Sequence, residues 1–439
     1  MLEKIFGTFS TRVLNALCGF ITLWIGTRYL GSTAWGIGGT VLVDVTLLLI
    51  GVELMAGSGL IYFTPRKSFR TIMKTSFLWI FIVISVYSIL FYILSFTPAL
   101  NVFVPEGYEV ILLILVFVYS FHNFNLNILI GKERVNTQNI IFIIQFMTQM
   151  LSMIGYIFIL DIRDARAFVY SLLTGYITGC ICGFFTIIKY INDDRHESLK
   201  ACMKEMLHFG TIIQLSSLLS LLNKRLSFYF IKSFSNISDV GIYNSGTQVS
   251  ECTKLIGHSI ALVQFSKISN LKDEKKAAQL TILFLKIAVA ATLFFNIILC
   301  IIPTEVYSWI FTDAFSGIRI VIITTSLGMA FMAANMVFSH YFSGINKPKH
   351  NLMASAVGLV VTIPSISTLV PLYGIAGAGI SFTLTSLATI IYQWIVFKKL
   401  SSAKSRELLP TAEDISLIKK EIMSFMTKNG LRKEKNEVQ

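Results

Sequence analysis

The sequence predicts an all-α protein that crosses a membrane many times, and three observations support this fold class. Only 14% of the 439 residues are charged and 54% are hydrophobic, whereas soluble domains carry about 25% charged residues. The chain contains 35 Phe but only 8 Pro, so proline rarely interrupts a helix. Apolar stretches of about 20 residues, the length that spans about 30 Å of hydrocarbon, recur along the whole chain.

Twelve of these stretches are long enough to be membrane-spanning helices. They are residues 8–30, 38–60, 75–95, 109–131, 138–160, 167–189, 207–231, 242–265, 278–302, 318–343, 351–371 and 376–397. The loops between them are short, so we expect no independent soluble domain. Only the residues after 400 form a sizeable aqueous segment.

Lys and Arg collect in alternate loops, which predicts the orientation of the spans. With a cytoplasmic N-terminus, the inside loops contain Arg66, Lys67, Arg70, Lys74, Lys132, Arg134, Lys189, Arg195, Lys200, Lys204, Lys267, Lys272, Lys275, Lys276, Lys347 and Lys349. The outside loops are almost free of cations, apart from Arg163, Arg166 and Lys232. Basic loops stay on the cytoplasmic side of membranes, so we expect both termini there. The same pattern explains the net charge of +13 without a nucleic-acid partner.

The segment 401–439 is expected to form an amphipathic helix in the cytoplasm. Thr411 and Asp414 resemble a capping box, and Gly430 is placed to end the helix. One face at helical spacing would carry Ile415, Ile418, Ile422, Phe425 and Met426. This face suits either the inner leaflet or a partner enzyme, and the sequence does not separate the two.

A weak internal repeat divides the chain into two halves. The turn at 30–37, after the first span, and the turn at 234–243, after the seventh, both contain a Gly-Ile pair that leads into the next span. Each turn has the same position in a group of six spans. We therefore predict one six-helix bundle over 1–200, a second over 201–400 and the tail over 401–439. Repeated bundles are typical of transporters, whose binding site lies between the repeats.

The seventh span carries an unusual triplet, Asn223-Lys224-Arg225, within an otherwise apolar run. A cation at the bilayer centre costs about 2.5–3.5 kcal/mol on insertion scales, so at least one of the two must face protein, water or a ligand. Adjacent helical residues point about 100° apart. We expect Arg225 to face a cavity while its neighbour pairs with a carboxylate of an adjacent span.

Short motifs at matching positions extend over essentially the whole chain. They are Arg28-Tyr29-Leu30-Gly31 with Gly36, Asn223-Lys224-Arg225 followed by Val240-Gly241-Ile242-Tyr243, Ser343-Gly344-Ile345-Asn346-Lys347-Pro348, and Tyr373-Gly374-Ile375-Ala376-Gly377-Ala378. Together with the span count, they resemble the polysaccharide (O-antigen type) flippases of the multidrug/oligosaccharidyl-lipid/polysaccharide (MOP) exporter superfamily. The resemblance implies a MATE-like fold and the flipping of an undecaprenyl-diphosphate-linked oligosaccharide across the bacterial inner membrane. One departure is Lys224, which stands where an acidic residue often follows.

Other ionisable residues inside the predicted spans are candidates for the substrate site, because such residues in membranes are rare and usually functional. They are Arg12, Arg28, Asp44, Glu53, Glu251, Lys254, Lys286 and Arg319. Cations outnumber carboxylates in this set. Arg binds phosphate oxygens in a fork and Lys acts as a point charge. A cavity lined by these cations would suit a lipid diphosphate or an acidic glycan.

Each candidate also has a structural alternative. The cations near the ends of their spans, Arg12, Lys286, Arg28 and Arg319, could extend to the aqueous surface. Glu251 and Lys254 lie three residues apart on one helix face and could neutralise each other. Both readings stay open.

Span 4 contains a polar run with two further candidates, Asn123 and Asn127, beside His122 and Asn125. This is too much polarity for a helix that faces lipid. The side chains could form hydrogen bonds between helices, or a wall that contacts the hydroxyl groups of a sugar. The sequence favours neither alternative.

A transporter is the function that the sequence favours, with two bundles that open alternately to either side. We expect no catalytic residue, cofactor or metal site, because the sequence has no P-loop and its six cysteines lack metal-like spacing. The expected partners are the lipid-linked oligosaccharide and membrane lipid; a polysaccharide polymerase and a chain-length regulator are candidate protein partners. Drug export by the same fold and, less favoured, a membrane glycan polymerase are the alternatives.

Overall fold

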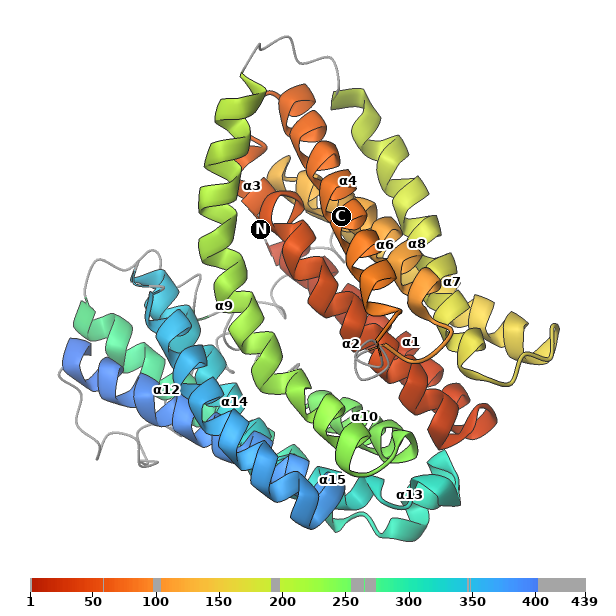
Figure 1. The fold of residues 1–439 in the computed structure, drawn as a ribbon. Coiled ribbons are helices and arrows are strands. Elements are labelled where there is room, and N and C mark those ends of the chain that lie inside the picture. Colours follow the sequence, from red (N-terminus) through yellow and green to blue (C-terminus); the bar gives the residue numbers. More distant parts are fainter. Residues whose placement is uncertain are drawn as a thin grey trace, which may run out of the picture.

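The computed structural model describes residues 2–57, 59–97, 104–190, 198–253, 264, 274–345, 347 and 349–401. Every regular element in these ranges is a helix (Figure 1). Eight helical segments in them are long and apolar enough to cross a membrane. The predicted all-α class is therefore confirmed. The predicted tail helix lies outside the described residues.

The N-terminal half forms one group of helices. They are α1 (Leu2–Tyr29), α2 (Gly31–Ala56), α3 (Gly59–Phe63), α4 (Phe69–Leu94), α6 (Glu109–Gly131), α7 (Val135–Phe158) and α8 (Ala165–Ile187), which is followed by a 3-10 turn at Ile188–Tyr190. Helix α7 packs between α1 and α8, and α6 packs between α8 and α2. Each of the first six predicted spans thus corresponds to one long helix of this group.

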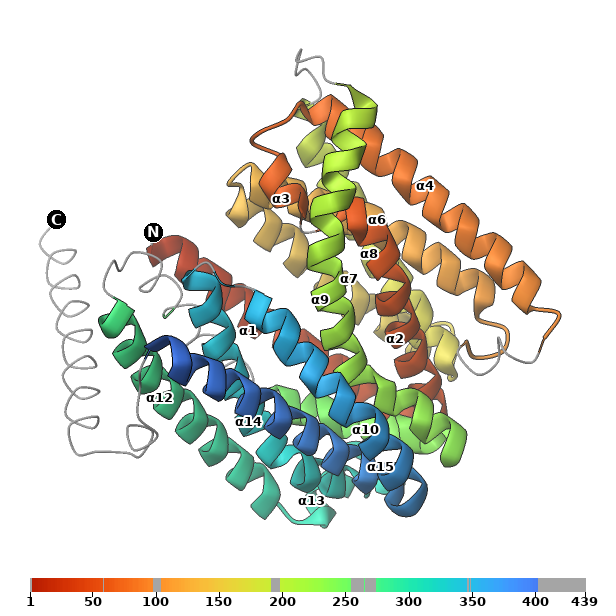
Figure 2. The same ribbon diagram turned by 60° about the vertical axis from the view of Figure 1, so that its left-hand side comes forward.

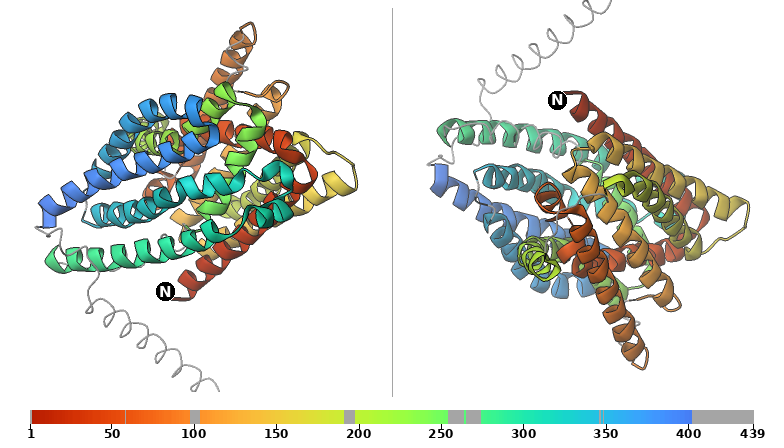
Figure 3. Two further views of the ribbon diagram at one scale, coloured as in Figure 1. Left: turned by 90° about the horizontal axis from the view of Figure 1, so that it is seen from below. Right: turned by 90° about the horizontal axis from the view of Figure 1, so that it is seen from above.

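The C-terminal half forms a second group. Its helices are α9 (Leu199–Phe234), α10 (Ile237–Glu251), α12 (Glu274–Ile301), α13 (Thr304–Phe311), a 3-10 turn at Asp313–Phe315, α14 (Ile318–Gly344) and α15 (Lys349–Ser401). Helices α12, α14 and α15 lie side by side (Figure 3). The last two predicted spans are two arms of α15, because the chain reverses at Gly374, whose φ of +53° favours glycine. A hydrogen bond of 2.7 Å between Thr362 and Thr385 joins these arms.

One helix, α9, contacts both groups. It runs beside the N-terminal half at one end and beside α15 at the other (Figures 1 and 2). In the N-terminal part of α9, a Cβ on Gly210 would overlap the carbonyl oxygen of Leu54, and Glu205 forms a 2.9 Å ion pair with Lys67. This part of α9 therefore anchors the second half of the chain on the first.

Two cations that depart from the positive-inside pattern are neutralised by carboxylates beside them. Arg163 lies 2.7 Å from Asp161, and Arg166 lies 2.6 Å from Asp164. The Asp164 side chain also caps α8 by accepting a hydrogen bond from the backbone N–H of Arg166. The hydrogen bond from the Arg166 side chain lowers the pKa of the Asp164 carboxyl. These paired cations are compatible with an outside loop.

Exposed aromatic side chains lie where the sequence predicts the outer membrane boundary. Tyr92 and Phe96 are at the end of α4, Trp309 is in α13, and Tyr373 is at the turn of α15. Aromatic residues are enriched where membranes meet water. Their common position at the ends of these helices is consistent with a boundary between membrane and water there.

The two halves meet most closely where α2 crosses α10, and both helices have a glycine at the crossing. A Cβ on Gly36 would overlap the carbonyl oxygen of Ile237, and a Cβ on Gly241 would overlap that of Ser32. These glycines are the ones that mark the weak internal repeat. The two copies of the repeated Gly-Ile motif therefore contact each other where the two halves meet.

Replacing Gly241 with Val should destabilise the protein by about 1–3 kcal/mol, because the added carbons must push α2 and α10 apart. The matched control is Gly155→Val in α7, where a Cβ would meet no heavy atom within 4 Å. Thermal unfolding in detergent measures the difference. Equal unfolding temperatures for the two variants would contradict a tight crossing.

Candidate functional site

The amide of Asn223 ties α9 to the first arm of α15. Its Nδ2 donates to the carbonyl of Ser355 at 2.8 Å, and its Oδ1 accepts from the hydroxyl of Thr362 at 3.1 Å. The amide also fills the space that a Cβ on Gly358 would occupy. Asn223 therefore fixes the position of the triplet relative to α15, and a direct contact with substrate stays a prediction.

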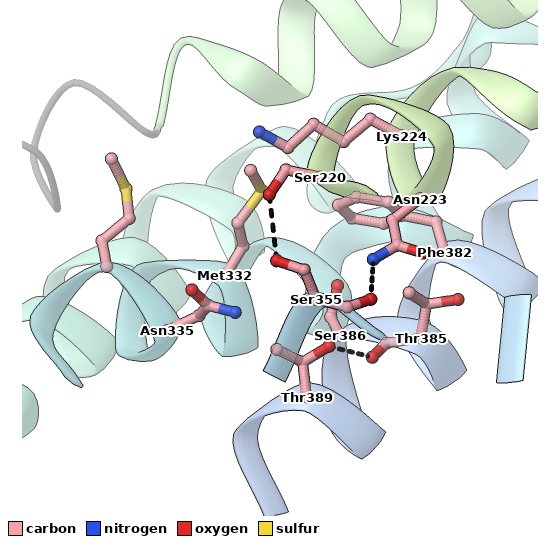
Figure 4. Close-up of a pocket in the computed structure, with 11 residues that line it drawn as sticks. Ser220, Asn223, Lys224, Met332, Asn335, Ser355, Phe382, Thr385, Ser386 and Thr389 are labelled. Atoms are coloured by element: carbon pink, nitrogen blue, oxygen red, sulfur yellow. Dashed lines mark hydrogen bonds between the residues drawn. The ribbon is translucent and has the colours of Figure 1, made fainter. Parts of the chain in front are cut away.

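A polar pocket of about 150 Å³ lies beside this junction, within the C-terminal half (Figure 4). It is lined by Ser220, Asn223, Lys224, Met332, Asn335, Met336, Ser355, Phe382, Thr385, Ser386 and Thr389. These residues come from α9, α14 and both arms of α15. Lys224 is the one charged residue among them. The structure thus places this predicted cation at a pocket lined with hydroxyl and amide groups.

Arg225 points away from this pocket, toward α10. Its guanidinium lies 5.3 Å from the centre of the Phe228 ring. Arg225 and Glu251 both interact electrostatically with the Tyr243 side chain of α10. Two of the predicted site residues, Arg225 and Glu251, therefore contribute to the electrostatic surroundings of Tyr243 on α10.

A second pocket, of about 200 Å³, lies between the two halves. It is lined by Ala16, Gly19, Phe20 and Leu23 of α1 and by Gln248, Glu251 and Cys252 at the end of α10. Glu251 is its one charged lining residue. Because binding sites of proteins with repeated bundles lie between the repeats, this location supports the choice of Glu251 as a site residue.

A buried carboxylate lies at the contact between α2 and α9. Asp44 is 4% exposed and accepts a 2.6 Å hydrogen bond from the hydroxyl of Tyr229. Lys232, one turn further along α9, interacts with Asp44 electrostatically. A buried charge needs such compensation. Lys232, the third cation expected outside, thus also has an acidic neighbour, and this neighbour belongs to the other half.

Glu53 forms a second polar contact between the halves. It accepts hydrogen bonds from Asn123 of α6 at 2.6 Å and from Gln214 of α9 at 3.2 Å. Asn127 in turn donates to the backbone carbonyl of Asn123 at 3.0 Å. The Asn123–Glu53 bond is the interhelical hydrogen bonding that the sequence offered as one alternative, whereas the Asn127 bond lies within α6. A contact of Asn123 or Asn127 with a sugar stays a prediction.

Two predicted cations lie near helix ends. Arg28 is exposed, with its guanidinium 5.7 Å from the centre of the Trp24 ring. Arg319 donates to the carbonyls of Ile302 at 3.1 Å and Cys300 at 3.4 Å. Carbonyl groups at a helix end lack partners within the helix, so Arg319 stabilises the end of α12.

The remaining predicted residues are placed only in part. Lys286 is half-buried on α12, and Arg12 belongs to α1, although its side chain is outside the described residues. Lys254 lies outside them entirely. Within the part of the chain that the structure describes, no group of three or more His, Cys, Asp or Glu side chains could hold a metal ion.

Sequence reasoning missed Tyr229 and the threonine pair at 362 and 385. Tyr229 is separated from Asp44 by 185 residues, and no local pattern distinguishes it from the other aromatic residues of its span. The threonines have a weak signal, since hydroxyl groups recur on one face of each arm of α15. That signal alone does not identify the Asn223 amide as their partner.

These features define a multi-pass helical membrane protein with polar and charged groups placed where two bundles meet. Solved structures share the fold. They include the Lipid II flippase MurJ in an inward closed conformation, at 18% identity and a TM-score of 0.68 over 92% of this chain and 90% of that one. A multidrug resistance MATE transporter of the MOP superfamily, in an inward-facing conformation, has 15% identity and a TM-score of 0.66 over 89% of this chain and 96% of that one. A mutant of the Vibrio cholerae MATE transporter VcmN has 12% identity and a TM-score of 0.64 over 93% and 98% of the respective chains.

The sequence comparison identifies the family. The model of the polysaccharide biosynthesis protein family matches residues 1–261, and the chain belongs to this family. No curated protein sequence matches the chain. The family match confirms the resemblance to a polysaccharide family that was inferred above from short motifs, and the solved structures confirm the MATE-like fold.

The Asp44–Lys232 contact predicts an asymmetric response to the loss of either charge. Lys232→Met should destabilise more than Asp44→Asn, because it leaves a nearly dry carboxylate uncompensated, whereas the half-buried lysine can extend to water. Because Lys232 is half-buried, the loss should be smaller than the value of about 3–5 kcal/mol for breaking a fully buried pair. The double variant should be more stable than Lys232→Met alone.

Thermal unfolding of the four proteins in detergent provides this double-mutant cycle. The control is Arg163→Gln, which removes an exposed cation. Its unfolding temperature should lie within about a degree or two of the wild-type value, because a surface ion pair contributes little to stability. If the changes in stability caused by Asp44→Asn and Lys232→Met simply add in the double variant, Asp44 and Lys232 do not interact.

Proposed function

We propose that this protein flips an undecaprenyl-diphosphate-linked oligosaccharide from the cytoplasmic to the outer leaflet of the bacterial inner membrane. Membership in the polysaccharide biosynthesis family supports the class of substrate. The fold shared with a lipid flippase and with MATE transporters supports transport as the activity. The observation that carries the proposal is the Lys224–Arg225 pair, which puts two cations on a helix between two membrane-embedded bundles.

Different cations act at different stages in this proposal. The head group meets Arg12 and Lys286 near the cytoplasmic side and reaches Arg225 later, since the triplet lies past the middle of its span. Arg225 suits the diphosphate because a guanidinium binds two phosphate oxygens at once. The polyprenyl chain stays in lipid throughout. Both termini lie in the cytoplasm, and a polymerase with its chain-length regulator acts on the product outside.

Drug export is the second candidate, and the similarity to MATE transporters favours it. A cationic drug needs carboxylates in the binding cavity. Here Asp44 is engaged by Tyr229, and Glu53 is engaged by two amides. These two carboxylates hold helices of the two halves together, which supports an anionic substrate. Glu251, which lines the pocket between the halves, is the carboxylate that favours the drug candidate. The short outside loops, with no paired catalytic carboxylates, favour a transporter over a glycan polymerase.

Alternating access requires the α2–α10 crossing to open, and a disulfide across it tests this requirement. The hydroxyls of Ser32 and Ser238 are 2.5 Å apart, so cysteines at both positions are close enough to form one. In a Cys252→Ser background, which removes the exposed native thiol, the oxidised Ser32→Cys/Ser238→Cys protein should lose most of its flipping of undecaprenyl-diphosphate oligosaccharide in proteoliposomes. Reduction should restore it.

Each single cysteine variant is the control and should flip the lipid under oxidising conditions. Full activity of the cross-linked protein would mean that the crossing stays closed during transport. Absence of flipping by the wild type, with drug efflux by the same proteoliposomes, would favour the second candidate.

Arg225→Gln should lower flipping to about a tenth of the wild-type rate or less, because it removes a charge-assisted hydrogen bond worth about 1.5–3 kcal/mol. Arg163→Gln removes a cation that is exposed and paired with Asp161, and it should leave the rate unchanged. Wild-type flipping by Arg225→Gln at equal protein level would remove Arg225 from the proposed path.

A further inference from the structure

We propose, on the basis of the proposed function, that the pocket beside Lys224 binds one negatively charged sugar of the oligosaccharide, while Arg225 serves the diphosphate. The two cations are adjacent on α9, so their side chains diverge by about 100°. Lys224 lines the pocket within the C-terminal half, and Arg225 is directed toward α10. In this arrangement the two cations have different surroundings, so each is placed to bind a different anionic group.

The wall of the pocket has the chemistry of a sugar site. Hydroxyl and amide groups of Ser220, Asn335 and Thr389 can exchange hydrogen bonds with sugar hydroxyls. The ring of Phe382 and the side chain of Met332 form an apolar surface for the C–H groups of a sugar ring. A polyprenyl chain would leave these polar groups without partners, and Lys224 would repel a metal cation.

The charge of the pocket selects an acidic sugar. Lys224 is its one charged lining residue, and no carboxylate lines it. A carboxylate or phosphate on the sugar would therefore gain a charge-assisted hydrogen bond that a neutral sugar lacks. A pocket of about 150 Å³ is also small beside the roughly 300–1,000 Å³ of sites for drug-sized ligands, which fits one sugar unit.

The floor of the pocket is held in place before any ligand binds. Asn223 bonds to Ser355 and Thr362, and Thr362 bonds to Thr385. The Ser220 and Ser355 hydroxyls are 3.0 Å apart. Such support keeps the contacting groups of a site in position. The amide of the triplet thus helps to hold the wall that Lys224 also lines.

The test compares two undecaprenyl-diphosphate disaccharides that differ only in the outer sugar, glucuronic acid or glucose. Binding to the full chain in lipid nanodiscs gives the two dissociation constants. We expect the wild type to bind the glucuronic acid form at least about tenfold more tightly, the effect of one charge-assisted hydrogen bond. Lys224→Gln should reduce this preference to less than about twofold, and Lys224→Arg should retain most of it.

Lys398→Gln, which removes an exposed cation at the end of α15, is the matched control and should keep the full preference. Binding of both probes without preference by the wild type overturns the sugar site alone. A preference that persists in Lys224→Gln also overturns it. Binding of neither probe by the wild type contradicts the proposed function itself. The glucose probe shows whether the Lys224 variants are folded.

Discussion

The close approach of α2 and α10 is the contact on which the arrangement of the two halves depends. Gly36 and Gly241 let each backbone reach a carbonyl group of the other helix, so neither position accepts a side chain. Two consequences follow from this spacing. Asn244 packs into the space beside Gly39, further along α2, and Asp44, one turn later, comes within 2.6 Å of Tyr229. A wider crossing would lengthen these contacts together, so the polar contact is a product of the glycine pair.

The three cations that depart from the positive-inside pattern each have an acidic neighbour. Arg163 and Arg166 are paired with carboxylates two residues away. Lys232 has its acidic neighbour, Asp44, on the other half of the protein. This last interaction links α2 to α9, whereas each of the other two lies within one segment of the chain.

The sequence predicted the helices well because crossing a membrane is a property of local length and hydropathy. Spans 109–131 and 318–343 differ from α6 and α14 by at most one residue at either end. The turn at Gly374 and the glycine pair were visible as motifs. Contacts between helices were not predictable in the same way, because they depend on the rotation of each helix. The sequence identified Asn223, Lys224 and Glu251 as unusual, yet it could not show that Asn223 bonds to α15 while Glu251 lies at a pocket beside α1.

The three side chains of the triplet point in different directions around the axis of α9. Three consecutive residues on a helix cover about 200° of its circumference, so one side chain reaches α15, the next a pocket, and the third α10. One helix can in this way present different chemistry to different neighbours within the C-terminal half. If the cations were one full turn apart, they would face the same direction and act as a single, more strongly charged site. Their adjacency instead separates the charges, so Lys224 lines the pocket beside α15 while Arg225 lies toward α10. The two cations can therefore bind two different anionic groups.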